Sequence, residues 1–353
     1  MAPHHAPLPS RRQFLGTLAA ATAAAATLPV YAQPAQKKNP APAAAAGVAP
    51  GPIQPASSRN AFVYKFGIGD IEAWSISDGH MVFKEGLGLM WPEAARPAMK
   101  DDLAAHGERL DALPLYVNIL VARIGNEIVL FDAGFGVRPN NREIGWVNDA
   151  LASIGIAPGQ ITQAFLSHAH GDHIGGFVTD NKAIFPNAAL HCLKAEVDFW
   201  RSPEPDFSRS KRAKGPLPNM IKDARNKFDV LQPNLQLHAG ATKILNGAIE
   251  IEPALGHTSG HAMFRLRSGK ESLLHFMDVA HHHTLMFTDP AWGIAFDHDP
   301  EQAVDTRKKL FAQLAATNER SYGFHLPWPG IGRVVPRKQG GYSWIGERWS
   351  WGS

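Results

Sequence analysis

The hydrophobic pattern of the chain changes repeatedly between a period of two and a helical period along residues 60–350, as in mixed α/β proteins. Alternating apolar runs bounded by turn residues predict strands over residues 62–68, 71–77, 115–124, 127–132, 161–166, 188–193, 235–239, 248–253, 262–267 and 272–276. Helical spacing predicts helices over residues 143–154, 194–200, 219–231 and 300–316, the last with Asp299 as its cap. Two strand-rich halves, each with helices, predict a four-layer sandwich with the sheets inside.

Three histidines and a carboxylate follow the apolar run 161–166 within six positions, namely His168, His170, Asp172 and His173. These side chains are typical ligands of a borderline metal such as zinc, and a glycine-bracketed turn can bring several of them to one point. His168 and His170 project to the same side of an extended segment, which suits one ion. Asp172 and His173 come later in the turn and suggest a second ion. The alternative is a solvated histidine-rich loop, but neither packing nor solubility requires this spacing.

The pattern H-x-H-x-D-H resembles the signature of the metallo-β-lactamase superfamily. The resemblance covers roughly residues 60–350 and implies an α/β fold of the αββα type. It also implies further site positions in a fixed order, which the sequence supplies as Asp132, His257, Asp278 and His325. Asp132 matches an aspartate that ends an early strand and orients the metal loop without touching substrate. His257 matches the third histidine of the first ion, Asp278 the bridging carboxylate, and His325 the last histidine of the second ion.

The resemblance therefore implies two divalent ions, with zinc as the expected metal. The ligands of the first ion would be His168, His170 and His257, those of the second Asp172, His173 and His325, and Asp278 would bridge. Two ions that share a solvent oxygen lower its pKa and give a hydroxide at neutral pH, since a single zinc already brings water to about 7. The expected reaction is hydrolysis without a serine or cysteine nucleophile, and Asp172 and Asp278 are the expected catalytic carboxylates.

Four further segments resemble the methyl parathion hydrolase family and its lactonase and arylesterase relatives, namely residues 185–188, 198–200, 307–311 and 327–332. Trp200 falls where that family carries an aromatic residue in a hydrophobic pocket, so we expect it to contact substrate, with packing of its helix as the alternative. Phe135 is a second expected substrate contact. Trp292 and Trp328 are further aromatic candidates.

Departures from the family pattern bear on the substrate. Met277 stands where relatives usually have glycine, and residues 281–283 are three histidines, for which a solvated turn is slightly favoured over pocket lining or ligand support. The loop 202–218 lacks the paired aromatic residues of an organophosphate pocket. No cluster of arginine or lysine side chains that would bind a phosphate monoester is evident. We therefore predict hydrolysis of a small hydrophobic lactone or aryl ester. The alternative is a phosphotriesterase of the methyl parathion hydrolase type.

Other classes of protein fit the same residues less well. Asp278 disfavours true β-lactamases of this fold, which usually carry cysteine or serine near that point, and His173 with His325 disfavours single-iron dioxygenases. No basic module of the kind found in RNA-processing members is visible. A periplasmic zinc-binding protein without catalysis is the contrasting hypothesis, against which Asp132 and a preformed dinuclear site count.

The amino-terminal segment resembles a twin-arginine export signal over residues 1–32, with an arginine pair, an alanine-rich apolar run and small residues at its end. Residues 33–59 read as a Pro/Ala-rich leader, and residues 60–353 as the hydrolase domain. The expected location is the periplasm. The apolar run is too short for a stable membrane anchor.

The net charge and the cysteine count bear on nucleic-acid binding and on disulfide formation. Removal of residues 1–32 takes away Arg11 and Arg12 and no acidic residue, so the formal charge falls from +3 to +1. A nearly neutral protein lacks the basic surface that nucleic acid requires. Cys192 is the only cysteine and is expected to be a buried apolar filler, which excludes an intramolecular disulfide. The sequence leaves open whether the protein forms a homodimer.

We expect the double substitution of Arg11 and Arg12 by Lys to keep the protein in the cytoplasm, because the arginine pair directs folded cargo to export. Cell fractionation with an antibody against the hydrolase domain measures the distribution. Export of the variant at the parental level would contradict a twin-arginine signal.

Overall fold

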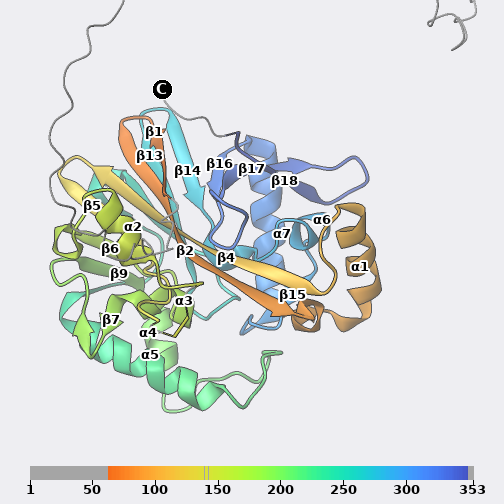
Figure 1. The fold of residues 1–353 in the computed structure, drawn as a ribbon, viewed down its shortest axis with the longest axis horizontal. Coiled ribbons are helices and arrows are strands. Elements are labelled where there is room, and N and C mark those ends of the chain that lie inside the picture. Colours follow the sequence, from red (N-terminus) through yellow and green to blue (C-terminus); the bar gives the residue numbers. More distant parts are fainter. Residues whose placement is uncertain (1–62, 139, 142, 349–353) are drawn as a thin grey trace, which may run out of the picture. The chain divides into compact units, whose positions relative to one another are not determined.

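Two seven-stranded sheets lie face to face in the computed structural model, which describes residues 63–138, 140–141 and 143–348 (Figure 1). Helices cover the outer face of each sheet, which confirms the predicted α/β fold with an αββα sandwich. The expected export signal and leader, residues 1–59, lie outside the described residues.

The first sheet has the strand order β1-β2-β4-β5-β6-β9-β10. Its strands are β1 (Val63–Ile68), β2 (Ile71–Lys84), β4 (Ala112–Ile124), β5 (Glu127–Phe131), β6 (Gln163–Phe165), β9 (Ala189–Leu193) and β10 (Leu235–His238). The strands β1, β2, β4 and β5 pair antiparallel, and β5, β6, β9 and β10 pair parallel. The parallel part places the carboxyl ends of several strands at one edge, where α/β proteins commonly bind ligands.

The second sheet has the order β11-β12-β13-β14-β16-β17-β18. Its strands are β11 (Thr242–Ile244), β12 (Ile249–Pro253), β13 (Ala262–Ser268), β14 (Glu271–His275), β16 (Arg320–Tyr322), β17 (Ile331–Pro336) and β18 (Tyr342–Gly346). Only β14 and β16 pair parallel in this sheet. β11 and the last three strands were not predicted, because their apolar runs are short or interrupted by Gly and Pro.

The helices are α1 (Arg96–Ala105), α2 (Val147–Ser153), α3 (Gly171–Ile174), α4 (Lys194–Arg201), α5 (Leu217–Leu231), α6 (Leu285–Thr288) and α7 (Pro300–Thr317). The predicted cap of α7 is confirmed, because the Asp299 side chain accepts a hydrogen bond from the backbone N–H of Gln302. The helix predicted from residue 143 begins only at Val147, whose N–H donates to Asp78 Oδ1 at 3.0 Å. No described helix is both long and apolar enough to span a bilayer.

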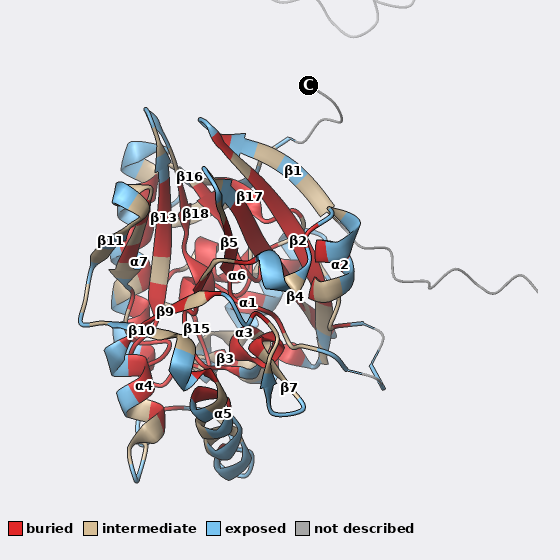
Figure 2. Cartoon of the chain, turned by 90° about the vertical axis from the view of Figure 1, so that its left-hand side faces the viewer, coloured by how far each residue is buried: buried red, intermediate tan, exposed pale blue. Residues whose placement is uncertain are grey.

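An aromatic contact in the core joins the inner faces of the two sheets. Phe131 of β5 stacks on Phe165 of β6 at 5.1 Å, and both rings contact Phe264 of β13, at 5.3 and 5.5 Å. All three side chains are buried. Figure 2 shows the strands between the helical layers largely in the red of buried residues. Burial of each ring contributes roughly 2–3 kcal/mol to stability. Cys192 is buried on β9, as expected of an apolar filler.

The long antiparallel pair of β2 and β4 carries an irregularity where it leaves the core. Its register shifts between Ser77 and Gly79, so that Asp78 is an extra residue in β2. Gly79 has φ +101°, and a Cβ there would collide with the carbonyl of Glu143, so only glycine fits. Beyond this bulge β2 runs on to Lys84, past its predicted end at residue 77.

Glu196 on α4 holds together two loops that come from different sheets. Its Oε1 accepts hydrogen bonds from the backbone N–H of Ala169 at 2.9 Å and from the indole Nε1 of Trp200 at 2.7 Å. Its Oε2 accepts from the hydroxyl of Thr258 at 2.6 Å and from the N–H of Gly260 at 3.0 Å. The Glu196 side chain is fully buried, so water could not replace its carboxylate as the acceptor for these four donors.

Replacement of Glu196 by Ala should lower stability by about 3 kcal/mol or more, because each orphaned buried donor costs roughly 1–3 kcal/mol. We expect Tm to fall by about 6 °C or more, measured by thermal unfolding followed by circular dichroism. The matched control is Glu204→Ala, an exposed glutamate that follows the same helix, which should change stability by less than about 0.5 kcal/mol. Equal midpoints for both variants would contradict a bracing role for Glu196.

Candidate metal centre

The segment after β6 brings four polar side chains to the carboxyl end of the first sheet. The chain leaves β6 at Phe165, passes through His168 and His170 in extended conformation, and enters α3, whose first turn carries Asp172 and His173. An N–H to carbonyl bond from His173 to His170 closes this turn at 3.0 Å. The local sequence therefore folds so that all four side chains start within one turn of each other.

Three further side chains reach the same point from the second half of the chain. His257 lies in the loop between β12 and β13, Asp278 directly follows β14, and His325 follows β16. Each is at most 2% exposed. The structure thus brings together all seven residues that the sequence analysis assigned as ligands, from segments up to 157 positions apart in the chain.

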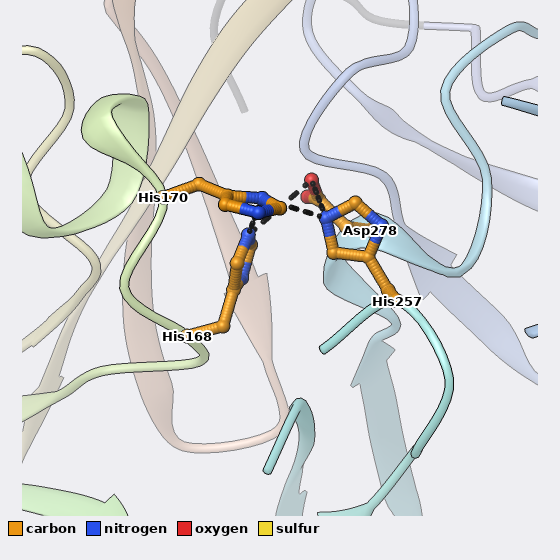
Figure 3. A group of neighbouring side chains, drawn as sticks. All are labelled: His168, His170, His257 and Asp278. Atoms are coloured by element: carbon orange, nitrogen blue, oxygen red, sulfur yellow. Dashed lines mark hydrogen bonds and ion pairs between the residues drawn. The ribbon is translucent and has the colours of Figure 1, made fainter. Parts of the chain in front are cut away.

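The first group of ligand atoms comprises His168, His170, His257 and Asp278 (Figure 3). His170 Nδ1 lies 2.9 Å from His168 Nε2 and 3.0 Å from His257 Nε2. Asp278 Oδ2 lies 3.2 Å from His257 Nε2 and 3.7 Å from His168 Nε2. In Figure 3 the three rings and the carboxylate point toward one common centre.

The second group lies on the other side of Asp278. His173 Nε2 lies 3.3 Å from Asp278 Oδ1 and 3.7 Å from Asp172 Oδ2. His325 Nε2 lies 3.2 Å from Asp278 Oδ2 and 3.5 Å from Asp172 Oδ2. Asp278 is therefore the one carboxylate that reaches both groups. His281 joins it, with Nε2 at 3.1 Å from Asp278 Oδ2.

These separations fit divalent ions. A tetrahedral ion with ligand bonds of about 2.0–2.1 Å sets neighbouring ligand atoms about 3.3 Å apart, close to the values in both groups. His173 Nε2 and Asp278 Oδ1 are buried without a hydrogen-bond partner, although a buried polar atom without one is costly. A cation between them would satisfy both atoms.

The outer ring nitrogens of four histidines contact acceptors. His173 Nδ1 lies 2.6 Å from Asp132 Oδ2, His257 Nδ1 2.8 Å from Asp297 Oδ1, His325 Nδ1 2.7 Å from the Tyr116 carbonyl and His168 Nδ1 2.9 Å from Ser167 Oγ. An acceptor at Nδ1 holds the proton there and leaves Nε2 free to bind metal. Asp132 also accepts both the N–H and the hydroxyl of Ser167, so it orients the ligand loop.

Protonation states in the first group favour metal binding. Burial lowers the pKa of His168 and of His170 well below the ordinary value, so both rings are neutral at pH 7. Burial alone would raise the pKa of Asp278, but the surrounding histidines, His173 foremost, hold it well below its usual range. The first group therefore presents two neutral imidazoles beside an ionised carboxylate, whereas burial acts to lower the pKa of its third histidine, His257, but Asp278 and Asp297 raise it above the ordinary value.

His173 differs from these two histidines. Burial acts to lower its pKa, but Asp278, Asp172 and Asp132 together raise it well above the ordinary value. A cation in the second group must displace this proton.

A cavity of about 320 Å³ opens above the metal ligands. Its apolar wall consists of Met81, Phe83, Leu115, Met220 and Phe296. The first three come from the paired ends of β2 and β4 beyond the bulge. The rest of the lining includes His281 and five of the seven ligands, and Arg212 contacts both parts.

The two expected substrate contacts lie elsewhere. Trp200 is fully buried, donates to Glu196 and packs 5.9 Å from Phe207, so the alternative reading of helix packing describes its position. Phe135 packs against the core, and its N–H donates to Asp78. Neither side chain lines the cavity. Trp292 is buried in the second core cluster, and Trp328 also lies outside the lining.

The triple histidine is a correction to the sequence analysis, which slightly favoured a solvated turn. His281 and His282 are 2% and 4% exposed, and the His281 ring stacks on His325 at 5.0 Å. The position of His281, three residues after a ligand, was the available signal. Met277 has φ +49°, a backbone conformation that glycine adopts more readily than a residue with a side chain.

Other site residues carried no sequence signal. Glu196 and Asp297 lie 23 and 19 positions from the nearest ligand in sequence, which are His173 and Asp278. Arg212 lies in the loop 202–218, from which the sequence analysis expected no clamp. Its guanidinium nevertheless lies 3.3 Å from His170 Nε2.

Comparisons with known proteins agree with this geometry. A model of the metallo-β-lactamase superfamily matches residues 112–325. AidC, described as a dizinc quorum-quenching lactonase in complex with a product, N-hexanoyl-L-homoserine, is 31% identical, with TM-score 0.78 over 82% of this chain and 99% of its own. A search of curated proteins gives no significant match.

Two more solved structures share the fold. The hydrolase AbOPH of the β-lactamase superfamily is 26% identical, with TM-score 0.73 over 82% of this chain and 99% of its own. An N-acyl homoserine lactone lactonase is 15% identical, with TM-score 0.51 over 75% of this chain and 95% of its own, a likeness of fold alone. The chain belongs to the metallo-β-lactamase superfamily and is a metal-dependent hydrolase.

Proposed function

We propose that the protein is a dinuclear metal hydrolase that opens a lactone with an apolar chain. The observation that carries the proposal is Asp278, whose carboxylate faces a three-histidine group on one side and a group of Asp172, His173 and His325 on the other. The two groups lie at the floor of a cavity with one apolar wall. Zinc is the proposed metal, since the ligands are imidazoles and carboxylates in a tetrahedral spacing.

Two divalent ions supply Lewis acidity toward an ester carbonyl and lower the pKa of water, which suits hydrolysis. The residues of the chain fix where this happens. Asp278 sets the spacing of the two groups, and Asp132 and Asp297 hold His173 and His257 in the ligand tautomer. Asp172, partly exposed at the cavity, is positioned to take part in proton transfer with the substrate.

The cavity favours an uncharged substrate with an apolar part. Arg212 is the only lysine or arginine among the described residues that line it, whereas a phosphate monoester calls for several such donors. A volume of about 320 Å³ is in the range of small-molecule sites. The product described for AidC is an N-acyl homoserine, so an N-acyl lactone is the proposed class. With the export signal, the reaction would take place in the periplasm.

Elemental analysis of the purified, metal-saturated domain should give two divalent ions per chain. The second group should lose its ion first as pH falls, because the carboxylates raise the pKa of His173 and a proton then competes with the metal. Titration from pH 8 to pH 5 with metal release as the readout measures this. At most one ion per fully folded chain at saturating metal would exclude the dinuclear site.

Asp278→Asn should abolish turnover, with kcat lowered by about a thousandfold or more, because the variant loses the charge shared by the two groups. Metal content should fall in the same preparation. Asp180→Asn is the matched control, since Asp180 is an exposed carboxylate in a turn. Full activity of Asp278→Asn would refute the bridging role.

A comparison of kcat/KM for an N-hexanoyl lactone and for a dimethyl aryl phosphorothioate, on one metal-defined preparation, tests the substrate class. We expect a preference for the lactone, because the wall opposite the ligands is aliphatic and aromatic and fits an acyl chain. A preference for the phosphorothioate would make phosphotriester hydrolysis the main function. Turnover of neither compound, with both sites filled, would favour a metal-binding protein.

A further inference from the structure

Arg212 is an arginine in the cavity wall whose neighbouring carboxylates, Asp172 and Asp297, act on it from beyond ion-pair distance. It forms no ion pair among the described residues, and its Nε is buried without a hydrogen-bond partner. Two arginines that are more deeply buried have more oxygen acceptors, although Nη2 of Arg307 also lacks a hydrogen-bond partner. Arg265 lies between Glu252 and Glu319, and Arg307 donates to three backbone carbonyls.

The guanidinium is nevertheless held in place. It lies 4.6 Å from the centre of the Phe296 ring, and Nη1 lies 3.7 Å from Met220 Sδ. Its one backbone acceptor is the Phe296 carbonyl, at the long distance of 3.5 Å from Nη2. Burial lowers the pKa of Arg212 to about 10, so the group remains charged at neutral pH. A fixed, charged donor therefore lines the cavity with most of its hydrogen-bonding capacity unused.

His170 is the neighbour that gives this arginine a chemical role. It is the one histidine of the first group that turns Nδ1, not Nε2, toward the other ligand atoms. A neutral imidazole that binds metal through Nδ1 carries its proton on Nε2. His170 Nε2 is then a donor, so it cannot accept from Arg212 Nη2 at 3.3 Å. The two groups become neighbouring donors without a shared acceptor.

We propose that Arg212 and His170 Nε2 together bind a second carbonyl oxygen of the substrate, the amide oxygen of an N-acyl lactone. This assignment rests on the proposed lactonase function and deepens it. The two donors lie on the side of the His170 ring that faces away from its ligand nitrogen Nδ1. They would therefore bind an oxygen next to the reacting ester and not the ester carbonyl itself. The same donors separate N-acyl lactones from simple alkyl lactones, because a site built to hydrogen-bond a polar group rejects the analogue without it.

The test compares two lactones of equal chain length, one N-acylated and one with a plain alkyl chain, in the metal-loaded enzyme and in Arg212→Met. Methionine keeps the packing over Phe296 and removes the donors. We expect kcat/KM for the N-acyl lactone to fall by about tenfold to a hundredfold, mainly through KM, and for the alkyl lactone by less than about threefold. Lys211→Met is the matched control, since it removes a neighbouring exposed cation.

A second measurement does not depend on turnover. Calorimetry of the N-acyl lactam that corresponds to the substrate should show the same loss of affinity in Arg212→Met, and unchanged affinity for the alkyl lactam. Metal content and Tm are measured on each variant. If Arg212→Met does not fold, Arg212→Lys takes its place, because it keeps the charge but loses the fork of donors.

The outcomes are distinct. An equal loss for both lactones, or for both lactams, would overturn the proposal, since Arg212 would then act on the metal ligands or the fold. A loss of affinity confined to the ring-opened hydroxy acid would overturn it in favour of product carboxylate binding. Failure of the wild type to open either lactone would refute the proposed function, and the lactam measurements would still decide the role of Arg212.

Discussion

A single buried carboxylate sets the geometry of this protein. Asp278 lies within 3.7 Å of ring nitrogens from five histidines, namely His168, His173, His257, His281 and His325. So many imidazoles can crowd around one charge only if each ring has a defined proton and orientation. Asp132, Asp297, Ser167 and the Tyr116 carbonyl provide this for four of the five rings by contacting their outer nitrogens, whereas Nδ1 of His281 is buried without a hydrogen-bond partner. The loops that carry these acceptors are therefore constrained as tightly as those that carry the ligands.

The site depends on the contact between the sheets. The first sheet supplies the segment from His168 to His173, and the second supplies the other ligands, so the groups keep their spacing only if the sheets do not slide. The Phe131, Phe165 and Phe264 contact fixes that registry from inside, and Glu196 fixes it at the edge through hydrogen bonds to both loops. Packing and chemistry are thus coupled through a few buried side chains.

The sequence predicted the layered fold because the strands up to β14 alternate clearly and α7 has a capped start. It missed β11 and β16 to β18, whose short runs resemble loops. It placed the start of α2 too early, because residues 143–146 share the helical spacing while Ile144 bridges to Gly79. Four ligands could be predicted because they are adjacent in sequence, and three more through the family pattern. Arg212 and Glu196 could not, since their roles arise from contacts with His170 and Ala169 that the fold alone creates. Trp200 failed as a substrate contact because an amphipathic helix hides one face, and sequence does not say which neighbour covers it.

The bulge divides β2 into two parts with different surroundings. Residues before it pack in the core, whereas Met81 and Phe83 beyond it pair with β4 and border the cavity. Val82 and Lys84, which alternate with Met81 and Phe83 along the strand, are exposed. Substitutions in this part of β2 should therefore cost little free energy of folding. Substitutions at the paired ends of β2 and β4 can therefore change the substrate range during evolution, while the ligands and the reaction stay the same.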